Sequence, residues 1–321
     1  MTDKIIIYPD GDDDTANELG AEQLQRLHGC GQFTLFTDVP ADQSAYIERI
    51  QDAHAVLLGW SLPSEVMAAA PGLELISFTG TGVEKFVDMA QAKARGITVC
   101  NAPGYGDNAV AEHAMALLFA CARNIAHHQR TLGSGQWDQS PMGMELKGKK
   151  IGLIGFGGIG QRFARLAQCL GMVVSVWTRS PQQYTARFPD IQFTSFDQLL
   201  QQSDIVSLHV AHTADTENLM DQAAFARIRP GAILINTARG EVIDETALVD
   251  ALNNRRLGAA GLDVFCNEPL PAHHPLIKMD NVVLTPHVAY STEEATRRLN
   301  RISVDNIIHF YAGNPTNVVT I

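Results

Sequence analysis

The fold is decided by the stretch Lys150-Ile151-Gly152-Leu153-Ile154-Gly155-Phe156-Gly157-Gly158-Ile159-Gly160. Its first half is an apolar strand, and its second half is a Gly-x-Gly-x-x-Gly motif. Gly155 permits a tight turn, Gly157 lets the main chain approach a pyrophosphate, and Gly160 lets the next helix pack closely on the strand. Because glycines also occur in ordinary turns, the motif is specific only between a strand and a helix.

The residues after the motif supply this context. A helix that Gly171 closes leads to a second predicted strand at Val173–Trp177. The apolar face of the helix consists of Ile159, Phe163, Leu166, Ala167 and Leu170. A pyrophosphate would lie at the positive end of such a helix, so the sequence predicts a Rossmann-type unit that binds a dinucleotide.

The end of the second strand bears on the choice between NAD and NADP. An NAD site usually has an acidic residue there, which accepts a hydrogen bond from the ribose 2′-hydroxyl. This chain has Thr178, Arg179 and Ser180 instead. Arg179 can pair with a 2′-phosphate, which makes NADP(H) the expected cofactor rather than NAD(H). The alternative is that Arg179 is a solvated loop cation and that the chain uses NAD without the acid.

Short apolar runs alternate with amphipathic stretches along the chain, which predicts an α/β protein with two doubly wound, mostly parallel sheets. Strands of the first series are expected at 5–8, 33–36, 55–58, 73–78 and 97–99, and helices near 20–28, 42–51, 63–70 and 84–94. Strands of the second series are expected at 151–154, 173–177, 191–193, 205–208, 232–235, 259–263 and 282–284. Longer helices are expected at 107–128 and 291–311.

Composition narrows the class of protein. The 321 residues carry 24 Lys and Arg against 35 Asp and Glu, a formal net charge of −11, which argues against a nucleic-acid or anionic-membrane partner. No apolar run reaches the ~18 residues of a membrane span. The cysteines are odd in number and scattered, which favours reduced thiols in the cytoplasm: Cys30, Cys100, Cys121, Cys169 and Cys266. No Cys/His spacing predicts a metal site.

Six motifs together make the chain resemble the D-isomer-specific 2-hydroxyacid dehydrogenases, including glyoxylate/hydroxypyruvate reductases and phosphoglycerate dehydrogenase. Beside the glycine motif they are Asn101-Ala102-Pro103 with Val110-Ala111-Glu112-His113, Ser207-Leu208-His209, Asn236-Thr237-Ala238-Arg239-Gly240, Gly261-Leu262-Asp263-Val264-Phe265 with Glu268-Pro269, and Thr285-Pro286-His287. The resemblance covers nearly the whole chain. It implies reduction of a small 2-oxo acid to the D-2-hydroxy acid, with Arg239, Glu268 and His287 as catalytic residues.

The chemistry of that reaction suits these three residue types. A cation must hold the substrate carboxylate and polarise the carbonyl, and Arg239 has a planar fork for this task. A group that titrates near neutrality must protonate the oxygen as hydride arrives, and His287 can do so as general acid/base. Glu268 would orient His287 and stabilise its imidazolium form. The alternatives are a helix-end ion pair for Arg239, a turn role for Glu268 and a loop histidine at His287.

The resemblance also implies binding residues. The cofactor would contact the glycine loop and the ends of neighbouring strands through Gly155, Gly157, Gly158, Ile159, Gly160, Thr178, Arg179, Ser180, His209, Thr237, Ala238 and Asp263. The substrate would contact Arg239, His287 and the backbone of Gly80, Thr81 and Gly82, whose glycines allow amides to converge on a carboxylate. The stretch 84–88 is about one residue longer than the usual family pattern.

The same resemblance sets the domain boundaries. A flavodoxin-like substrate-binding domain is expected from residues 1–101 together with 291–321, and a Rossmann-type dinucleotide-binding domain from residues 102–290. The helix after Asn101 would help to form a homodimer.

Two other functions fit the same fold. One is a regulatory protein that senses the redox state of the dinucleotide, against which the complete set of Arg239, Glu268 and His287 argues. The other is oxidation of formate or phosphite. Formate dehydrogenases resemble the chain less, because they carry glutamine where Glu268 stands.

Overall fold

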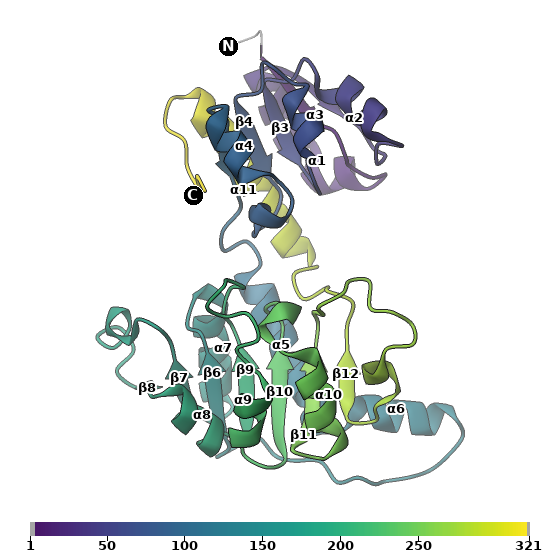
Figure 1. The fold of residues 1–321 in the computed structure, drawn as a ribbon, viewed down its shortest axis with the longest axis vertical. Helices are drawn as coiled ribbons and strands as arrows, with labels where there is room; N and C mark the ends of the chain where they lie inside the picture. The colour runs from purple at the N-terminus through teal and green to yellow at the C-terminus, as the bar shows by residue number, and fades with distance from the viewer. Residues whose placement is uncertain (1–3, 320–321) are drawn as a thin grey trace. The chain divides into compact units, whose positions relative to one another are not determined.

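The computed structural model describes residues 4–319, which fall into two compact units. The first unit combines the chain up to Gly106 with the chain from Thr292 onward, and the second unit is Asp107–Ser291. In Figure 1 the first unit is purple to blue with a yellow helix, and the second runs from teal to yellow-green. Each unit has its own sheet and its own hydrophobic core.

The first unit is built on a five-stranded parallel sheet with the order β2-β1-β3-β4-β5, which is the flavodoxin-like order. Its strands are β1 (Ile5–Tyr8), β2 (Gln32–Leu35), β3 (Ala55–Leu58), β4 (Leu75–Phe78) and β5 (Thr98–Cys100). Its helices are α1 (Thr15–Cys30), α2 (Gln43–Ile50), α3 (Ser64–Ala68), η1 (Val83–Lys85), α4 (Met89–Ala94) and α11 (Glu293–Tyr311). The strands β3 and β4 are fully buried, as expected of central parallel strands.

Helix α11, from the far end of the chain, completes this unit by packing on α1 and β4. Buried polar contacts fix it there. The Ser77 hydroxyl donates to the Ser303 carbonyl at 2.8 Å, and the Asn306 amide donates to the Asn101 carbonyl at 2.9 Å. Because Asn306 is fully buried, these bonds specify where α11 lies as well as contributing to stability.

The second unit is built on a seven-stranded parallel sheet with the order β12-β11-β10-β9-β6-β7-β8, which extends the Rossmann order by one strand. Its strands are β6 (Lys150–Ile154), β7 (Val173–Trp177), β8 (Gln192–Phe193), β9 (Ile205–Leu208), β10 (Ala232–Asn236), β11 (Leu257–Leu262) and β12 (Val282–Leu284). The predicted fold class, two doubly wound parallel-sheet units, is therefore confirmed.

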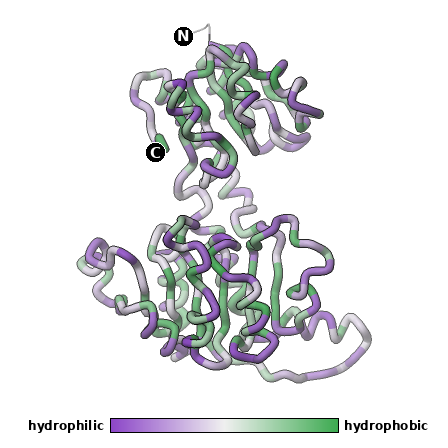
Figure 2. The backbone as a smooth tube through the Cα atoms, viewed as in Figure 1, coloured by the Kyte–Doolittle hydropathy of each residue, from purple (hydrophilic) through white to green (hydrophobic). Residues whose placement is uncertain are grey.

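Helices cover both faces of the second sheet. Successive side chains of a strand point to opposite faces, so neighbouring residues of one strand join different cores. Ile233 and Ile235 join the core beneath α5 and α7, whereas Leu234 joins the core beneath the other helices. Figure 2 shows the hydrophobic colour concentrated along the strands of each unit. The helical segments of this unit are α5 (Asp107–Ala122), α6 (Ile125–Gly133), α7 (Gly158–Cys169), η2 (Pro181–Gln183), α8 (Phe196–Gln202), α9 (Gln222–Arg227), η3 (Gly240–Val242), α10 (Glu245–Asn253) and η4 (Pro275–Lys278).

The prediction of one helix over 107–128 was wrong. The chain breaks between α5 and α6 at Asn124, whose φ of 52° is left-handed, a conformation that asparagine tolerates better than most residues. Its side-chain amide donates to the carbonyls of Pro141 and Met142 at 3.2 and 3.3 Å. The break is therefore held by a contact from a distant segment. The helix predicted near 84–94 likewise splits into η1 and α4.

Candidate active site

Three adjacent parallel strands place the predicted catalytic residues at one edge of the second sheet. Strands β10, β11 and β12 are neighbours in the sheet order. Arg239 follows β10, Glu268 lies on the loop after β11, and His287 follows β12. Parallel strands bring their carboxyl ends to the same edge, which is where open α/β sheets bind ligands.

The structure joins His287 to Glu268. Nδ1 of His287 lies 2.7 Å from Oε2 of Glu268, and both side chains remain more than a third exposed. The other carboxylate oxygen of Glu268 accepts from the backbone N–H of Phe265 at 2.9 Å, which anchors it to its own loop. The Tyr290 ring and the imidazole meet at nearly a right angle, with ring centres 6.1 Å apart. The carboxylate thus fixes the orientation of the imidazole through Nδ1.

His287 itself has a φ of 54°, in the left-handed region that costs a residue with a β-carbon roughly 1–2 kcal/mol. Its backbone N–H donates to the Asp263 carbonyl at 2.8 Å. The next two N–H groups, of Val288 and Ala289, donate to the Asp263 carboxylate at 3.0 and 2.9 Å. These bonds offset the strain and fix the direction in which the imidazole leaves the backbone.

Arg239 sits on a loop that Asn236 shapes. The fully buried Asn236 side chain donates to the Arg239 carbonyl and accepts from the Ala238 N–H, both at 2.9 Å. The next residue, Gly240, has no room for a side chain, since a β-carbon there would lie 2.0 Å from the backbone of Phe265. The sequence pattern alone assigned no role to Asn236 or Gly240. The signal for Asn236 is an amide side chain at the end of an otherwise apolar strand, where it can bond the backbone of the next loop.

The guanidinium of Arg239 bonds locally, with Nη1 donating to the Ala238 carbonyl at 2.7 Å. Across residues 4–319, no hydrogen bond or ion pair joins Arg239 to Glu268 or His287. The structure therefore brings together two of the three predicted catalytic side chains and places the third on the adjacent strand end.

The glycine loop between β6 and α7 has the shape that the motif predicts. Gly155 has a φ of 98°, and a β-carbon there would lie 2.3 Å from the carbonyl oxygen of His209. At Gly160 a β-carbon would lie 2.9 Å from the Gly155 carbonyl. At Gly157, by contrast, it would project into open space, so a ligand can approach the backbone. The positive end of α7 lies at this opening, which suits an anionic pyrophosphate.

Two predicted cofactor residues have buried polar atoms without a partner among the residues that the structure describes. These atoms are Nδ1 of His209 and Oγ1 of Thr237. His209 packs against Phe163, and its Nε2 lies 2.9 Å from Oγ of Ser207. Burial lowers the pKa of His209 to about 3, so its ring is neutral at pH 7. Unpartnered polar atoms at a strand end, beside an open glycine loop, fit a bound dinucleotide.

The residues predicted to meet the adenosine ribose lie at the end of β7. Thr178 and Ser180 are half-buried, and Arg179 is exposed. The guanidinium of Arg179 forms an ion pair with Asp215 at 3.0 Å, with both side chains more than 60 % exposed. An exposed pair of this kind contributes little to stability, so Arg179 can exchange its partner for a ligand at small cost.

The predicted substrate loop, Gly80 to Gly82, belongs to the first unit. It follows β4 and ends at Gly82, whose φ of 74° requires glycine. The Gly80 carbonyl accepts from the Ala102 N–H at 2.8 Å, which ties the loop to the segment that follows β5. In the stretch 84–88 that follows this loop, Phe86 stacks on Phe78, with ring centres 5.2 Å apart.

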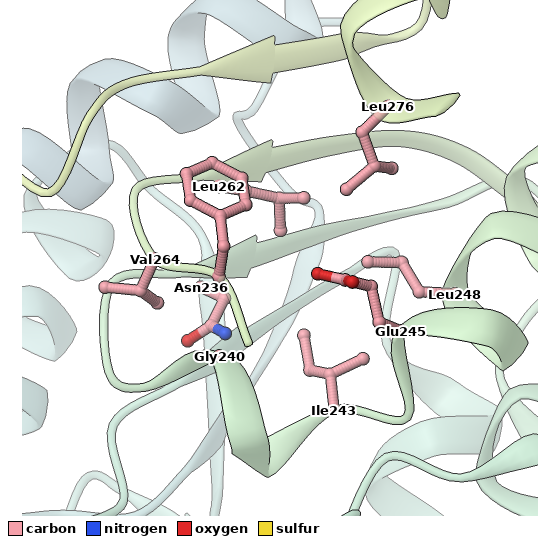
Figure 3. A pocket seen from close by; sticks show the side chains of 9 residues that line it. Asn236, Gly240, Ile243, Glu245, Leu248, Leu262, Val264 and Leu276 are labelled. Atoms are coloured by element: carbon pink, nitrogen blue, oxygen red, sulfur yellow. The ribbon is translucent and has the colours of Figure 1, made fainter. Parts of the chain in front are cut away.

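A pocket behind the Arg239 loop is separate from the predicted site residues (Figure 3). Its lining consists of Asn236, Gly240, Ile243, Glu245, Leu248, Leu262, Val264, Phe265 and Leu276. The Glu245 carboxylate points into this apolar setting, and its Oε2 lies 3.1 Å from Nε2 of His274. The pair links the start of α10 to the N-cap of η4.

Within residues 4–319, no helix is long and apolar enough to cross a membrane. The same residues contain no cluster of three or more His, Cys, Asp or Glu side chains that could hold a metal ion.

Comparison with known proteins gives the family. Residues 115–289 match the model of the D-isomer specific 2-hydroxyacid dehydrogenase NAD binding domain. The chain is 35% identical over 286 residues to a hydroxypyruvate reductase of Blautia hydrogenotrophica, covering 87% of this chain and 88% of the relative. It is 39% identical over 284 residues to a glyoxylate reductase of Thermofilum pendens, covering 86% and 84%.

A similar solved structure is an acyclic imino acid reductase in complex with NADPH and D-Arg, with a TM-score of 0.87 and 32% identity over 98% of this chain and 100% of that one. The sequence motifs, the parallel sheets and these matches agree. The chain belongs to the D-isomer-specific 2-hydroxyacid dehydrogenase family, and it is an oxidoreductase that acts on the CH–OH group of a 2-hydroxy acid with a nicotinamide dinucleotide.

Proposed function

We propose that this protein reduces a small 2-oxo acid of the glyoxylate/hydroxypyruvate class to the D-2-hydroxy acid, with His287 as general acid. The observation that carries the proposal is the His287–Glu268 pair at 2.7 Å, at the sheet edge that also bears Arg239. The names of the relatives from Blautia hydrogenotrophica and Thermofilum pendens support the substrate class.

Each side chain has a definite task in this reaction. When bound, the nicotinamide supplies a hydride to C2 of the oxo acid. The Arg239 guanidinium binds the substrate carboxylate and polarises the carbonyl. His287 delivers the Nε2 proton to the carbonyl oxygen, which becomes the hydroxyl of the product. The Glu268 carboxylate at Nδ1 stabilises the imidazolium until that proton leaves.

We assign dinucleotide binding to the second unit and substrate binding to the first. The open backbone at Gly157, the N-terminus of α7 and the unpartnered atoms of His209 and Thr237 support the first assignment. The glycine-rich loop Gly80–Gly82, with a left-handed Gly82, supports the second, because turns of this kind can present backbone N–H groups to a carboxylate.

We also propose that NADPH is preferred over NADH. At the end of β7 the chain offers Thr178, Arg179 and Ser180, with no carboxylate among them to repel a 2′-phosphate. The exposed Arg179 supports this proposal, since its ion pair with Asp215 is readily replaced by one with phosphate.

We propose that the protein acts as a homodimer in the cytoplasm. The exposed Trp137 and Met142, 83% and 94% accessible, support an interface on the segment after α6, because large apolar side chains in one exposed segment favour association. None of the five cysteines, all within residues 4–319, forms a disulfide, which suits a reducing compartment. Light scattering after size-exclusion chromatography tests the first point, and cell fractionation tests the second.

Absorbance at 340 nm tests the activity directly. The purified chain is mixed with NADPH or NADH and with glyoxylate, hydroxypyruvate, pyruvate or a bulkier 2-oxo acid, and the product is resolved on a chiral column. We expect oxidation of the reduced cofactor with glyoxylate and with hydroxypyruvate, and a D-product from hydroxypyruvate. His287→Gln should abolish most of the turnover, while the exposed His273→Gln should not. Cofactor binding without turnover of any 2-oxo acid would point to a dinucleotide sensor instead.

A further inference from the structure

A chain of three side chains lies behind His287, and the reaction proposed above gives none of them a chemical step. Nε2 of His113 lies 2.9 Å from Oγ1 of Thr285, and this hydroxyl lies 2.5 Å from Oδ1 of Asp263. Asp263 is fully buried, and its carboxylate also accepts from the N–H groups of Val288 and Ala289. All of these residues belong to the second unit.

The direction of this chain follows from the donors available. A carboxylate accepts only, so the single hydroxyl proton of Thr285 must point to Asp263. The hydroxyl oxygen can then only accept from His113, which requires the proton on Nε2 of that ring. The hydrogen bonds therefore run in one direction, from His113 through Thr285 to Asp263.

The sheet itself brings the three residues together. Leu262 and Leu284 are paired in register between β11 and β12, so Asp263 and Thr285 are the first residues after two adjacent strand ends. Their backbones remain joined, because Thr285 N–H donates to the Leu262 carbonyl at 3.0 Å. Helix α5, which carries His113, packs on both strands.

The other end of the chain is the loop that carries His287. Asp263 accepts three consecutive backbone N–H groups of this loop: that of His287 on its carbonyl and those of Val288 and Ala289 on its carboxylate. Five residues further along, Glu268 bonds Nδ1 of the same histidine. Asp263 thus fixes the backbone of His287, while Glu268 fixes its ring.

We infer that His113 and Thr285 are positioning residues, which hold the Asp263 carboxylate in the one orientation that keeps His287 in its left-handed, reactive position. The inference rests on the proposed role of His287. It gives Asp263 a positioning task besides the cofactor contact expected from the sequence, because its carboxylate accepts from three donors of this chain and retains acceptor capacity on Oδ2.

Matched variants of Thr285 test the hydrogen bond apart from the shape of the side chain. Thr285→Val keeps the volume and removes both bonds, while Thr285→Ser keeps the hydroxyl. Thr246→Val, on the exposed surface of α10, is the control. We expect Thr285→Val to lower kcat roughly tenfold to a hundredfold, because small misplacements of a reacting group have effects of this size. Thr285→Ser should recover most of the rate, and the Kd for the cofactor should change less than about twofold.

A second readout does not depend on turnover. In the cofactor-free protein, hydrogen exchange of the peptide spanning 285–291 should be faster in Thr285→Val than in the parent chain and near normal in Thr285→Ser. Should Thr285→Val fail to fold, two variants of His113 repeat the comparison. His113→Gln can still donate to the Thr285 hydroxyl, whereas His113→Leu cannot.

The inference is overturned by a Thr285→Val variant with parental kcat and exchange, by equal losses in the Ser and Val variants, or by a loss that appears in cofactor Kd alone. Failure of the proposed function would look different, because the parent chain itself would not turn over any 2-oxo acid. The hydrogen-exchange comparison would then still report on the loop that carries His287.

Discussion

Nδ1 of His287 and Oε2 of Glu268 lie 2.7 Å apart, although 18 residues and a strand of the sheet separate them in the chain. The carboxylate is itself held by the Phe265 N–H, so the imidazole has one preferred orientation. In the proposed reaction, a histidine held in this way gives up its Nε2 proton without first reorienting.

Glu268→Gln tests the charge of this pair. The amide can keep a hydrogen bond to the ring but cannot stabilise the imidazolium, so kcat for 2-oxo acid reduction should fall about tenfold to a hundredfold, the effect of a lost charge-assisted bond. Steady-state kinetics measure this fall, and fluorescence titration should show unchanged cofactor binding. A parental kcat would remove Glu268 from the mechanism.

Arg239→Lys tests the fork of the guanidinium. Lysine keeps the positive charge but loses the two parallel N–H donors that match a carboxylate. We expect KM for the 2-oxo acid to rise and kcat/KM to fall about a hundredfold, in line with the removal of one group that stabilises developing charge. Exposed Arg227→Lys, on α9, is the matched control and should leave both constants unchanged.

The ion pair of Arg179 with Asp215 allows the cofactor preference to be changed in both directions. Arg179→Ala should weaken NADPH binding about tenfold, because a charge-assisted bond to the 2′-phosphate is lost. Asp215→Asn removes a competing negative charge and should strengthen NADPH binding roughly threefold to fivefold, at the interaction energy expected for charges in water. NADH binding serves as the internal control, and equal effects on both cofactors would contradict the preference for NADPH.

Asn236→Ala should lower stability. It leaves the Arg239 carbonyl and the Ala238 N–H without the partner that the structure shows, at a cost of about 2–3 kcal/mol. For a unit of this size, the loss corresponds to a Tm roughly 4–10 °C lower. Differential scanning calorimetry measures the change, and exposed Asn253→Ala should show almost none. A parental Tm would mean that solvent replaces both bonds.

The buried ring of His209 makes stability depend on pH. Its folded-state pKa of about 3 lies below the usual 6.5, so below pH 6.5 the unfolded chain binds a proton that the folded chain refuses. The contribution of the neutral His209 ring to the free energy of unfolding is therefore fully present above pH 6.5. It falls as the pH drops toward 3, by about 2 kcal/mol between pH 7 and pH 5. Urea unfolding at the two pH values should show this loss in the parent chain and a smaller one in His209→Gln. Equal pH dependence in the two chains would show that His209 titrates freely in the folded state.

Much of the fold follows from local pattern. The strands 5–8, 55–58, 173–177, 205–208 and 282–284 have the predicted bounds, because a short apolar run between turns has few other stable states in a parallel sheet. The helix predicted over 107–128 failed at Asn124, since the bonds that hold the break come from Pro141 and Met142. The composition and the hydrophobic periodicity of 107–128 do not indicate such a contact.

The sequence by itself determined the glycine motif, the alternation of strands and helices, and the residue types from which a family resemblance predicts a catalytic site. Only the tertiary structure decided that Asp263 turns its carboxylate to the loop of His287, and that His113 and Thr285 stand behind it. The physical reason is that a hydrogen bond depends on direction as well as distance. His113 and Thr285, 172 positions apart, acquire both only when strand register and helix packing are fixed.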